Sequence, residues 1–208
     1  MNRAWGPQGG GSGRLGSGGE RERLVDAFTK VVAERGFAGI ETNEVTREAG
    51  LSREAFDEHF RDLRQCLIVA YDRFCDDLVA EIEDALQPGA PWPQQVRAGV
   101  HAALGFVRES AAVARVFAVE GPTLGTAVID RYIGAIERIV ALLRLGRASS
   151  PAAALPPLTE AVLVAGAVSL VTACLLAEEE AGLPQLEEQL IEVLLLPYGS
   201  EEQAGPAA

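Results

Sequence analysis

The chain has 208 residues, of which 48% are hydrophobic, and a formal net charge of −12. This hydrophobic content excludes an intrinsically disordered protein and is enough for one compact domain, or for a small domain followed by a larger one. Three cysteines, an odd number without CxxC spacing, lie inside apolar periodic segments, which favours reduced thiols over a disulfide framework. The N-terminus has no apolar run long enough for a signal peptide, so we expect a cytoplasmic protein.

Residues 1–19 are rich in Gly and Ser, a composition typical of a flexible tail. Apolar residues at helical spacing then predict a first helix over about residues 20–35, which Gly36 ends. The apolar face of this helix comprises Leu24, Ala27, Phe28, Val31 and Val32. No stretch of the chain alternates with period two long enough to make a strand, so the predicted fold class is all-α.

The next segments have the pattern of a helix-turn-helix (HTH). A short helix is expected over about residues 42–49, Gly50 makes the turn, and Ser52 is a suitable N-cap for a second short helix over residues 53–60. Together with the first helix, these elements predict a three-helix HTH domain at residues 20–66.

A longer helix, about residues 62–86, leads from the HTH domain into a larger helical domain at residues 67–200, and residues 201–208 form a second tail. Breaks rich in Pro and Gly divide the larger domain. Its further predicted helices cover about residues 94–109, 111–119, 126–145, 158–181 and 184–196.

One segment raises the question of a membrane. "AVLVAGAVSLVTACLLA", residues 161–177, is uncharged and near the lower length limit for a bilayer-spanning helix. Glu160 and the "EEE" run at 178–180 flank it, without the Lys or Arg that anchor spanning helices. A buried helix of a soluble protein is therefore favoured over a membrane span. We expect this helix and the following "LEEQLIEVLLL" helix to pack against their copies in a homodimer.

The N-terminal sequence resembles the TetR family of transcriptional regulators. "RLVDAFTKVVAERGFAGIETNEVTREAGLSREAFDEHFRDLRQCL" follows the family's pattern without insertion or deletion, chiefly through "ERGF", "EAGLS" and "HF.D". The order and lengths of the later helices are also similar to the family's ligand-binding and dimerisation domain. The resemblance implies a homodimer whose paired HTH domains bind a double-stranded DNA operator, and a small molecule in the C-terminal domain that releases the DNA.

Carried over position by position, the resemblance implies DNA contacts for particular side chains. Thr42 and Asn43 match positions that touch phosphate and base at the start of the first HTH helix, and Arg53 matches a base-reading position. Arginine can bind guanine and asparagine can pair with adenine, so direct readout is chemically available. His59 matches the family's common histidine and could donate a hydrogen bond to a phosphate.

Four positions depart from the family pattern. Glu41 stands where the N-cap is usually Thr, Glu54 where the residue is usually small, Asp57 where a Tyr contacts phosphate, and Leu63 where Lys is usual. Residues 20–66 hold eight basic and eleven acidic residues, a net charge of −3. Because DNA affinity rests largely on cations that displace counterions, lost phosphate contacts should weaken binding.

Two interpretations of this acidic domain stay open. In the first, a working repressor directs its arginines toward DNA while the acids point away, and Glu54 offsets the helix dipole in the first turn. In the second, a dimeric ligand-binding or protein-interaction module carries an HTH that no longer binds DNA. In the first interpretation, the arginines that lie toward DNA are Arg3, Arg14, Arg47, Arg53, Arg61 and Arg64. The candidate DNA-binding residues are Thr42, Asn43, Arg47, Arg53, Glu54, Asp57 and His59.

The C-terminal domain carries most of the negative charge, which argues against its touching nucleic acid. Its His101, Phe106, Phe117 and Tyr132 are candidates to line an apolar effector pocket, because aromatic side chains with a few polar groups are typical of such pockets. Taken singly, each aromatic residue is more often core, and His101 more often lies at the surface. A pocket for an apolar small molecule is implied by the family resemblance.

Catalysis and metal binding find little support in the sequence. The two histidines lie far apart, and there is no HExxH, GxSxG or P-loop motif. Cys66 and Cys75 have no accompanying Cys or His pair. We therefore expect neither an enzyme nor a resident metal or cofactor.

Overall fold

The computed structural model describes residues 17–121, 125–147, 150–177 and 183–199. Within these ranges the chain is helical and has no strand, which confirms the all-α prediction. Arg3, Arg14, the "EEE" run at 178–180 and nearly all of both predicted tails lie outside the described residues.

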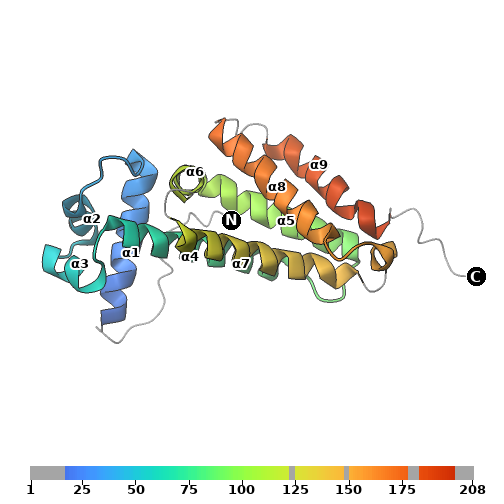
Figure 1. Ribbon diagram of the computed structural model, residues 1–208, viewed down its shortest axis with the longest axis horizontal. Helices are drawn as coiled ribbons and strands as arrows, with labels where there is room; N and C mark the ends of the chain where they lie inside the picture. The colour runs from blue at the N-terminus through green and yellow to red at the C-terminus, as the bar shows by residue number, and fades with distance from the viewer. Residues whose placement is uncertain (1–16, 122–124, 148–149, 178–182, 200–208) are drawn as a thin grey trace, which may run out of the picture. The chain divides into compact units, whose positions relative to one another are not determined.

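The helices follow the predicted order, and most of their bounds lie within a few residues of the predicted ones. The helix predicted at 126–145 ends at Leu143 and is followed by a 3-10 turn. Residues 178–181 of the helix predicted at 158–181 lie outside the described residues. Figure 1 shows α1 (Ser17–Arg35), α2 (Thr42–Ala49), α3 (Arg53–His59), α4 (Leu63–Ala85), α5 (Trp92–Glu109), α6 (Ala111–Glu120), α7 (Thr126–Leu143), α8 (Thr159–Leu176) and α9 (Leu183–Leu195). Short 3-10 helices are η2 (Arg144–Gly146), η3 (Pro151–Ala154) and η5 (Leu196–Tyr198).

The chain divides into two compact units. The N-terminal unit comprises residues 1–74 and 109–131, and the C-terminal unit comprises residues 75–108 and 132–208. Helices α4, α5 and α7 contribute residues to both units. The division of function between residues 20–66 and 67–200 stays a prediction.

The N-terminal unit is held by α1, which packs against α2, α3 and α6. The five residues predicted for the apolar face of α1 are all buried. Phe28 on this face packs edge-on against Phe37, with ring centroids 6.2 Å apart, and Phe56 and Phe60 of the HTH are also fully buried. Burial of these aromatic rings stabilises the unit, in which α2 and α3 pack against α1.

The three cysteines are reduced thiols. Cys66 is buried, whereas Cys75 and Cys174 are half-buried. Burial raises the pKa of the Cys66 thiol, so this side chain acts as a small packing residue and not as a nucleophile.

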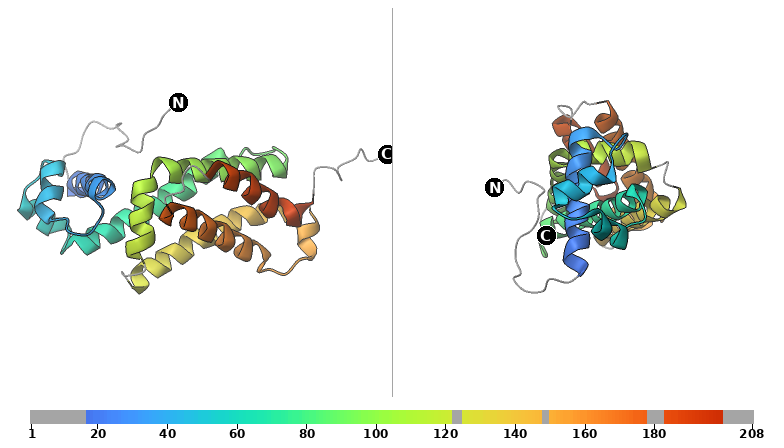
Figure 2. Two further views of the ribbon diagram at one scale, coloured as in Figure 1. Left: turned by 90° about the horizontal axis from the view of Figure 1, so that it is seen from above. Right: turned by 90° about the vertical axis from the view of Figure 1, so that its left-hand side faces the viewer.

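In the C-terminal unit, α8 and α9 run side by side (Figure 2). Val164 of α8 and Leu194 of α9 share a core cluster with Val96 and Val140. However, only Glu160, Val164 and Leu175 are buried in α8. The prediction of a buried helix is therefore wrong for the single chain, because the described residues cover only one side of α8.

The uncovered side of α8 is apolar. Val162 is 67% exposed, Leu170 52% and Leu176 50%. By length and composition alone, α8 is the one helix in the described ranges that could cross a membrane, and 17% of its 18-residue window is buried.

Candidate nucleic-acid interface

The start of α2 presents the first two predicted DNA contacts. Glu41 is the N-cap residue, and its backbone N–H donates to the Glu44 carboxylate at 2.9 Å. The same carboxylate pairs with Arg35 of α1. Thr42 is half-buried and Asn43 is exposed. Glutamate in place of the usual threonine thus still starts α2 at the expected residue and leaves Asn43 accessible.

The turn between α2 and α3 is set by a glycine, a local N-cap and a hydrogen bond from α1. Gly50 has left-handed backbone angles, φ 62° and ψ 37°, which glycine adopts without strain. Arg23 of α1 donates from Nη2 to the Ala49 carbonyl at 2.6 Å, and Ser52 Oγ accepts from the Ala55 N–H at 3.2 Å. Ser52 is therefore the N-cap, as predicted, and α3 begins at the residue that follows it.

Arg53, the predicted base-reading residue, is paired with Asp57 one turn along α3. Arg53 Nε lies 2.9 Å from Asp57 Oδ1 and 3.2 Å from Oδ2. The two side chains are 53% and 52% exposed. Their i, i+4 spacing is a signal that the sequence already carried, because such residues are neighbours on a helix surface. Asp57 is therefore an intramolecular partner of Arg53 and not only a repulsive charge.

Glu54 lies in the first turn of α3 and is exposed. Hydrogen bonds from its own backbone N–H and then from Ser52 hold the pKa of its carboxyl below the ordinary value. This arrangement supports the interpretation of Glu54 as first-turn compensation of the helix dipole.

His59 is less accessible than the predicted phosphate contact requires. Its side chain is 12% exposed, and Nε2 is buried 3.7 Å from the Glu20 carboxylate, without a hydrogen-bond partner among the described residues. In this conformation Nε2 is therefore not accessible to a phosphate.

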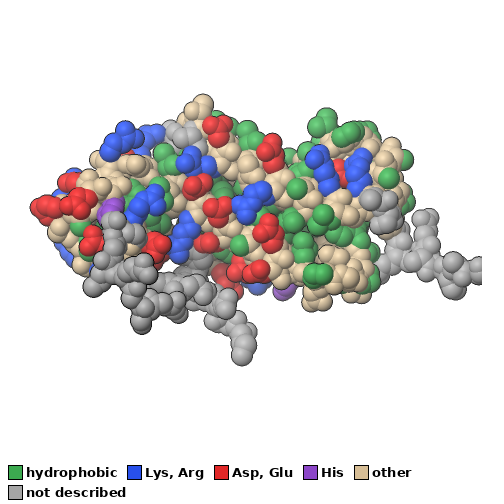
Figure 3. All heavy atoms as spheres, turned by 90° about the horizontal axis from the view of Figure 1, so that it is seen from below, with side chains coloured by type: hydrophobic (Ala, Val, Ile, Leu, Met, Phe, Trp, Pro, Cys, Tyr) green, Lys and Arg blue, Asp and Glu red, His purple; other side chains and the backbone are tan. Residues whose placement is uncertain are grey.

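Several other acids of the HTH segment have internal partners. Glu48 pairs with Lys30 of α1 at 2.5 Å, and the hydrogen bond raises the pKa of that lysine. Asp62 Oδ1 accepts from the Gln65 N–H at 2.8 Å. Arg47 is exposed. Figure 3 shows acidic and basic side chains interspersed on the face that it draws, without a continuous basic surface.

The four predicted effector residues are divided between the two units. Phe117 belongs to the N-terminal unit, where it is buried and packs edge-on against Tyr71 and Phe74, each at a centroid distance of 5.2 Å. His101 and Tyr132 belong to the C-terminal unit and are exposed. Phe117 is therefore placed as a core residue.

His101 forms a surface contact, since its Nδ1 lies 2.9 Å from Glu187 Oε1 and its side chain is 72% exposed. Phe106 is half-buried. A cavity of about 140 Å³ in the same unit is smaller than typical effector pockets and includes none of the four predicted residues. It is lined by Ala85, Gln87, Ala90, Gln94, Gln95 and Ala98.

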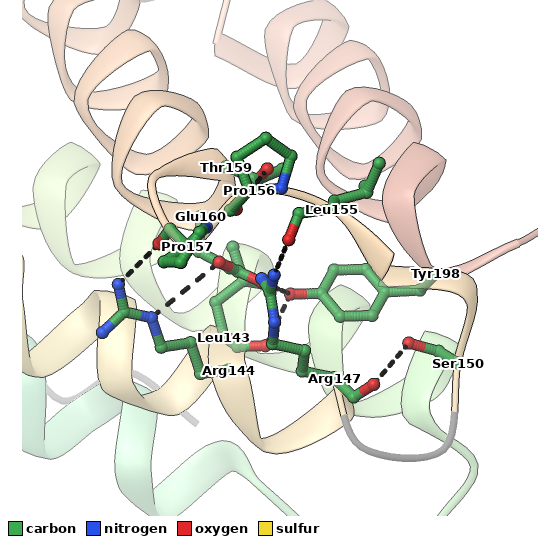
Figure 4. Close-up of polar contacts among 10 residues, drawn as sticks. All are labelled: Leu143, Arg144, Arg147, Ser150, Leu155, Pro156, Pro157, Thr159, Glu160 and Tyr198. Carbon is green, nitrogen blue, oxygen red and sulfur yellow. Dashed lines mark hydrogen bonds and ion pairs between the residues drawn. The ribbon is translucent and has the colours of Figure 1, made fainter. Parts of the chain in front are cut away.

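A buried ionic cluster lies at the start of α8 and was not anticipated from the sequence (Figure 4). Glu160 is fully buried, and its Oε1 lies 2.5 Å from Arg147 Nη1. Arg144 Nε lies 3.8 Å from Glu160 Oε2. Tyr198 donates to the Leu143 carbonyl at 2.7 Å, and its hydroxyl is 3.5 Å from Glu160 Oε1. These contacts join the end of α7, the start of α8 and η5.

The cluster also fixes the segment between α7 and α8. Arg147 donates to the Leu155 carbonyl, and Arg144 Nη2 donates to the Pro157 carbonyl at 2.9 Å. Burial, followed by the neighbouring Glu160, raises the pKa of Tyr198, so its hydroxyl stays a donor. Among the described residues there is no group of three or more His, Cys, Asp or Glu placed to hold a metal ion.

By sequence, the chain is similar over part of its length to HTH-type transcriptional regulators. No family model matches the chain. It is 28% identical over 87 residues to the HTH-type transcriptional activator FasR of Mycolicibacterium smegmatis, covering 42% of this chain and 40% of that protein. It is 27% identical over 115 residues to an uncharacterized HTH-type transcriptional regulator of Mycobacterium tuberculosis, covering 53% and 54%. The chain thus spans about half the length of these relatives or less.

Solved structures share the whole fold at lower sequence identity. The fatty acid degradation regulator FadR of Bacillus halodurans has a TM-score of 0.74 at 16% identity, covering 92% of this chain and all of that one. FadR of Bacillus subtilis, solved in complex with stearoyl-CoA, has a TM-score of 0.70 at 16% identity, covering 86% and 99%. A TetR-family regulatory protein of Rhodococcus RHA1 has a TM-score of 0.65 at 17% identity, covering 86% and 97%.

These matches cover 86–92% of the chain, far more than the N-terminal motifs. The resemblance drawn from the sequence is therefore confirmed: the chain has the all-α fold of the TetR family of transcriptional regulators.

Proposed function

We propose that this chain is a homodimeric, cytoplasmic transcriptional regulator of the TetR type that binds an operator in double-stranded DNA, with repression as the expected sign. The main support is Arg53, which is exposed at the first position of α3. Ser52 caps this helix, and α2 and α3 both pack against α1. An arginine in this place can bind the O6 and N7 atoms of guanine in the major groove.

The acidic charge of the HTH does not argue strongly against DNA binding. Glu44 and Glu48 are paired with cations of α1, and Asp57 is paired within α3. An acid whose charge is already compensated repels a phosphate less than a free one. This favours a working regulator over an HTH that has lost DNA binding.

The homodimer is supported by the apolar side of α8 that the chain leaves uncovered, together with exposed Val193 of α9 and Leu196 of η5. Exposed apolar patches of this kind mark association surfaces. Two copies of the α8–α9 pair would form a four-helix interface.

The proposed effector is an apolar small molecule bound in the C-terminal domain. The FadR protein of Bacillus subtilis was solved with stearoyl-CoA, which makes a long-chain acyl-CoA the first probe for this chain. A ligand that binds the native state at about a hundredfold excess over Kd should raise Tm by about 5–10 °C. A flat thermal-shift response to stearoyl-CoA and to a broad apolar library would contradict the effector part of the proposal. Phe106→Ala and Tyr132→Ala test whether those side chains line the site.

The DNA-binding part is tested by selecting bound fragments of the source genome and footprinting the enriched promoters, beginning with those next to the gene. Wild-type protein should protect a palindromic site, and Arg53→Ala should lose it. Arg97→Ala, which changes an exposed arginine of α5, is the matched control and should leave protection intact. If wild-type protein protects no site even at low salt, the alternative applies: a dimeric ligand-binding or interaction module without DNA binding.

A further inference from the structure

We infer that Asp57 is a positioning residue that holds the Arg53 guanidinium for recognition of one guanine. This inference rests on the DNA-binding function proposed above and adds a specificity-determining role for an acid. On charge alone, an aspartate in a recognition helix would only weaken binding to DNA.

The geometry of the pair leaves the reading end of Arg53 available. The Nε–H is shared by the two carboxylate oxygens of Asp57, at 2.9 Å and 3.2 Å. The contacts that Arg53 makes with described residues run through Nε to Asp57 and not through its Nη groups. The carboxylate therefore binds the side of the guanidinium, and both Nη groups stay free to donate.

Guanine matches this arrangement. Its major-groove edge presents two acceptors, O6 and N7, which a guanidinium binds with two parallel hydrogen bonds. Adenine presents one acceptor and one donor there, so a guanidinium in the same position can donate only one hydrogen bond to it. An arginine fixed by a second contact has less rotational freedom to lose when it docks.

The i, i+4 spacing places Asp57 next to Arg53 on the surface of α3, so the helix itself holds the carboxylate beside the guanidinium. Capping by Ser52 fixes the start of α3, so Arg53 and Asp57 share one helix face. Both side chains are about half exposed, and such a pair adds little to folding stability. Its effect should therefore appear in base preference and not in folding.

A charge-matched control lies on the same helix. Glu58 is exposed, and none of the described residues contacts its carboxylate through a hydrogen bond or ion pair. Glu58→Gln removes one negative charge from α3, as Asp57→Asn does, but leaves the Arg53 pair intact. A general effect of charge must therefore appear in both variants, whereas positioning of Arg53 must appear only in Asp57→Asn.

The experiment is selection from a library of DNA duplexes with a randomised central segment, sequenced after binding to the full-length protein. Wild type, Arg53→Ala, Asp57→Asn, Glu58→Gln and the double variant Arg53→Ala/Asp57→Asn are compared. Circular dichroism melts confirm that each variant folds like wild type.

Wild type should enrich a palindrome with guanine at one symmetry-related position, and Arg53→Ala should lose that preference. Asp57→Asn should lower the preference for guanine there by about two- to tenfold, the range expected when one long side chain loses its fixed geometry. Its total affinity should stay equal or rise. Glu58→Gln should keep the wild-type preference. In the Arg53→Ala background, Asp57→Asn should not change the base preference at this position any further.

Three results overturn the inference while the proposed function stands. These are an unchanged guanine preference in Asp57→Asn, an equal change in Asp57→Asn and Glu58→Gln, or a guanine preference that survives in Arg53→Ala. If wild type enriches no sequence at all, the proposed function fails, and the role of Asp57 fails with it.

Discussion

The Arg147 guanidinium meets the Glu160 carboxylate at 2.5 Å inside the C-terminal unit, and Glu160 has no exposed surface. A buried carboxylate is costly unless it is paired and hydrogen-bonded. The pair also holds the chain between α7 and α8, since Arg147 contacts the Leu155 carbonyl. We therefore expect this cluster to control the stability of the C-terminal unit.

Glu160→Gln should destabilise the protein, because it leaves the positive charges of Arg144 and Arg147 without their carboxylate. Breaking a buried pair costs about 3–5 kcal/mol, and we expect about 3 kcal/mol here because Arg147 retains some exposure to water. This corresponds to a fall in Tm of about 6–12 °C in thermal denaturation. A Tm within about 2 °C of wild type would contradict the assigned role.

The stability gained from Glu160 should depend on pH in a defined direction. Burial raises the pKa of Glu160, but its own backbone N–H, Arg147 and Arg144 outweigh burial and hold this pKa below the ordinary value. A lowered carboxyl pKa stabilises the folded state above the unfolded pKa, and this gain is lost as pH falls through the folded pKa.

The difference in Tm between wild type and Glu160→Gln should therefore be constant near pH 7 and shrink below about pH 4. Thermal melts of both proteins across that range measure it. A difference that grows on acidification would mean that the folded pKa is raised.

Gly146→Ala is expected to destabilise the same unit by overpacking. A Cβ added at Gly146 would overlap the indole ring of Trp92, which itself packs against Tyr198 at a centroid distance of 5.7 Å. Overpacking of this kind costs about 1–3 kcal/mol, a loss of about 2–12 °C in Tm. Gly105→Ala, whose added Cβ meets no atom within 4 Å, is the control and should not lower Tm.

The helices and caps of the HTH could be predicted because their causes are local. Periodic apolar residues gave α1 its buried face, Gly50 supplies a left-handed turn, and Ser52 caps α3. Each of these features depends on a few consecutive residues, so spacing alone specifies it.

Contacts between distant segments could not be predicted. The pairing of Glu48 with Lys30 joins two helices, and the burial of Glu160 depends on Arg147 and on Tyr198 far along the chain. Nothing in the sequence distinguishes Glu160 from a solvated flank of an apolar helix. Likewise, Phe117 is an aromatic residue of the kind that lines apolar pockets, but it packs in the N-terminal unit against Tyr71 and Phe74. These two partners lie more than 40 positions earlier in the sequence, so spacing could not identify them.

Dimer formation should depend on the exposed side of α8. Val162→Glu places a charge in the proposed four-helix interface and should convert the dimer to a monomer in sedimentation velocity. Val119→Glu is the matched control, because Val119 of α6 is 55% exposed and lies outside α8 and α9. A wild-type monomer in detergent-free buffer, partition of the protein into membranes, or equal dissociation by both variants would contradict the proposed interface.

We expect this acidic HTH to recognise DNA through Arg53. Fluorescence anisotropy on the duplex selected by wild type, and on the same duplex with the contacted guanine replaced, tests it most directly. Arg53→Ala should cost about 1–3 kcal/mol on the selected duplex and nothing on the replaced one, whereas Arg47→Ala should weaken both alike and reduce the salt dependence. Binding of wild type to neither duplex at low salt, or an equal loss on both duplexes for Arg53→Ala, would contradict the account.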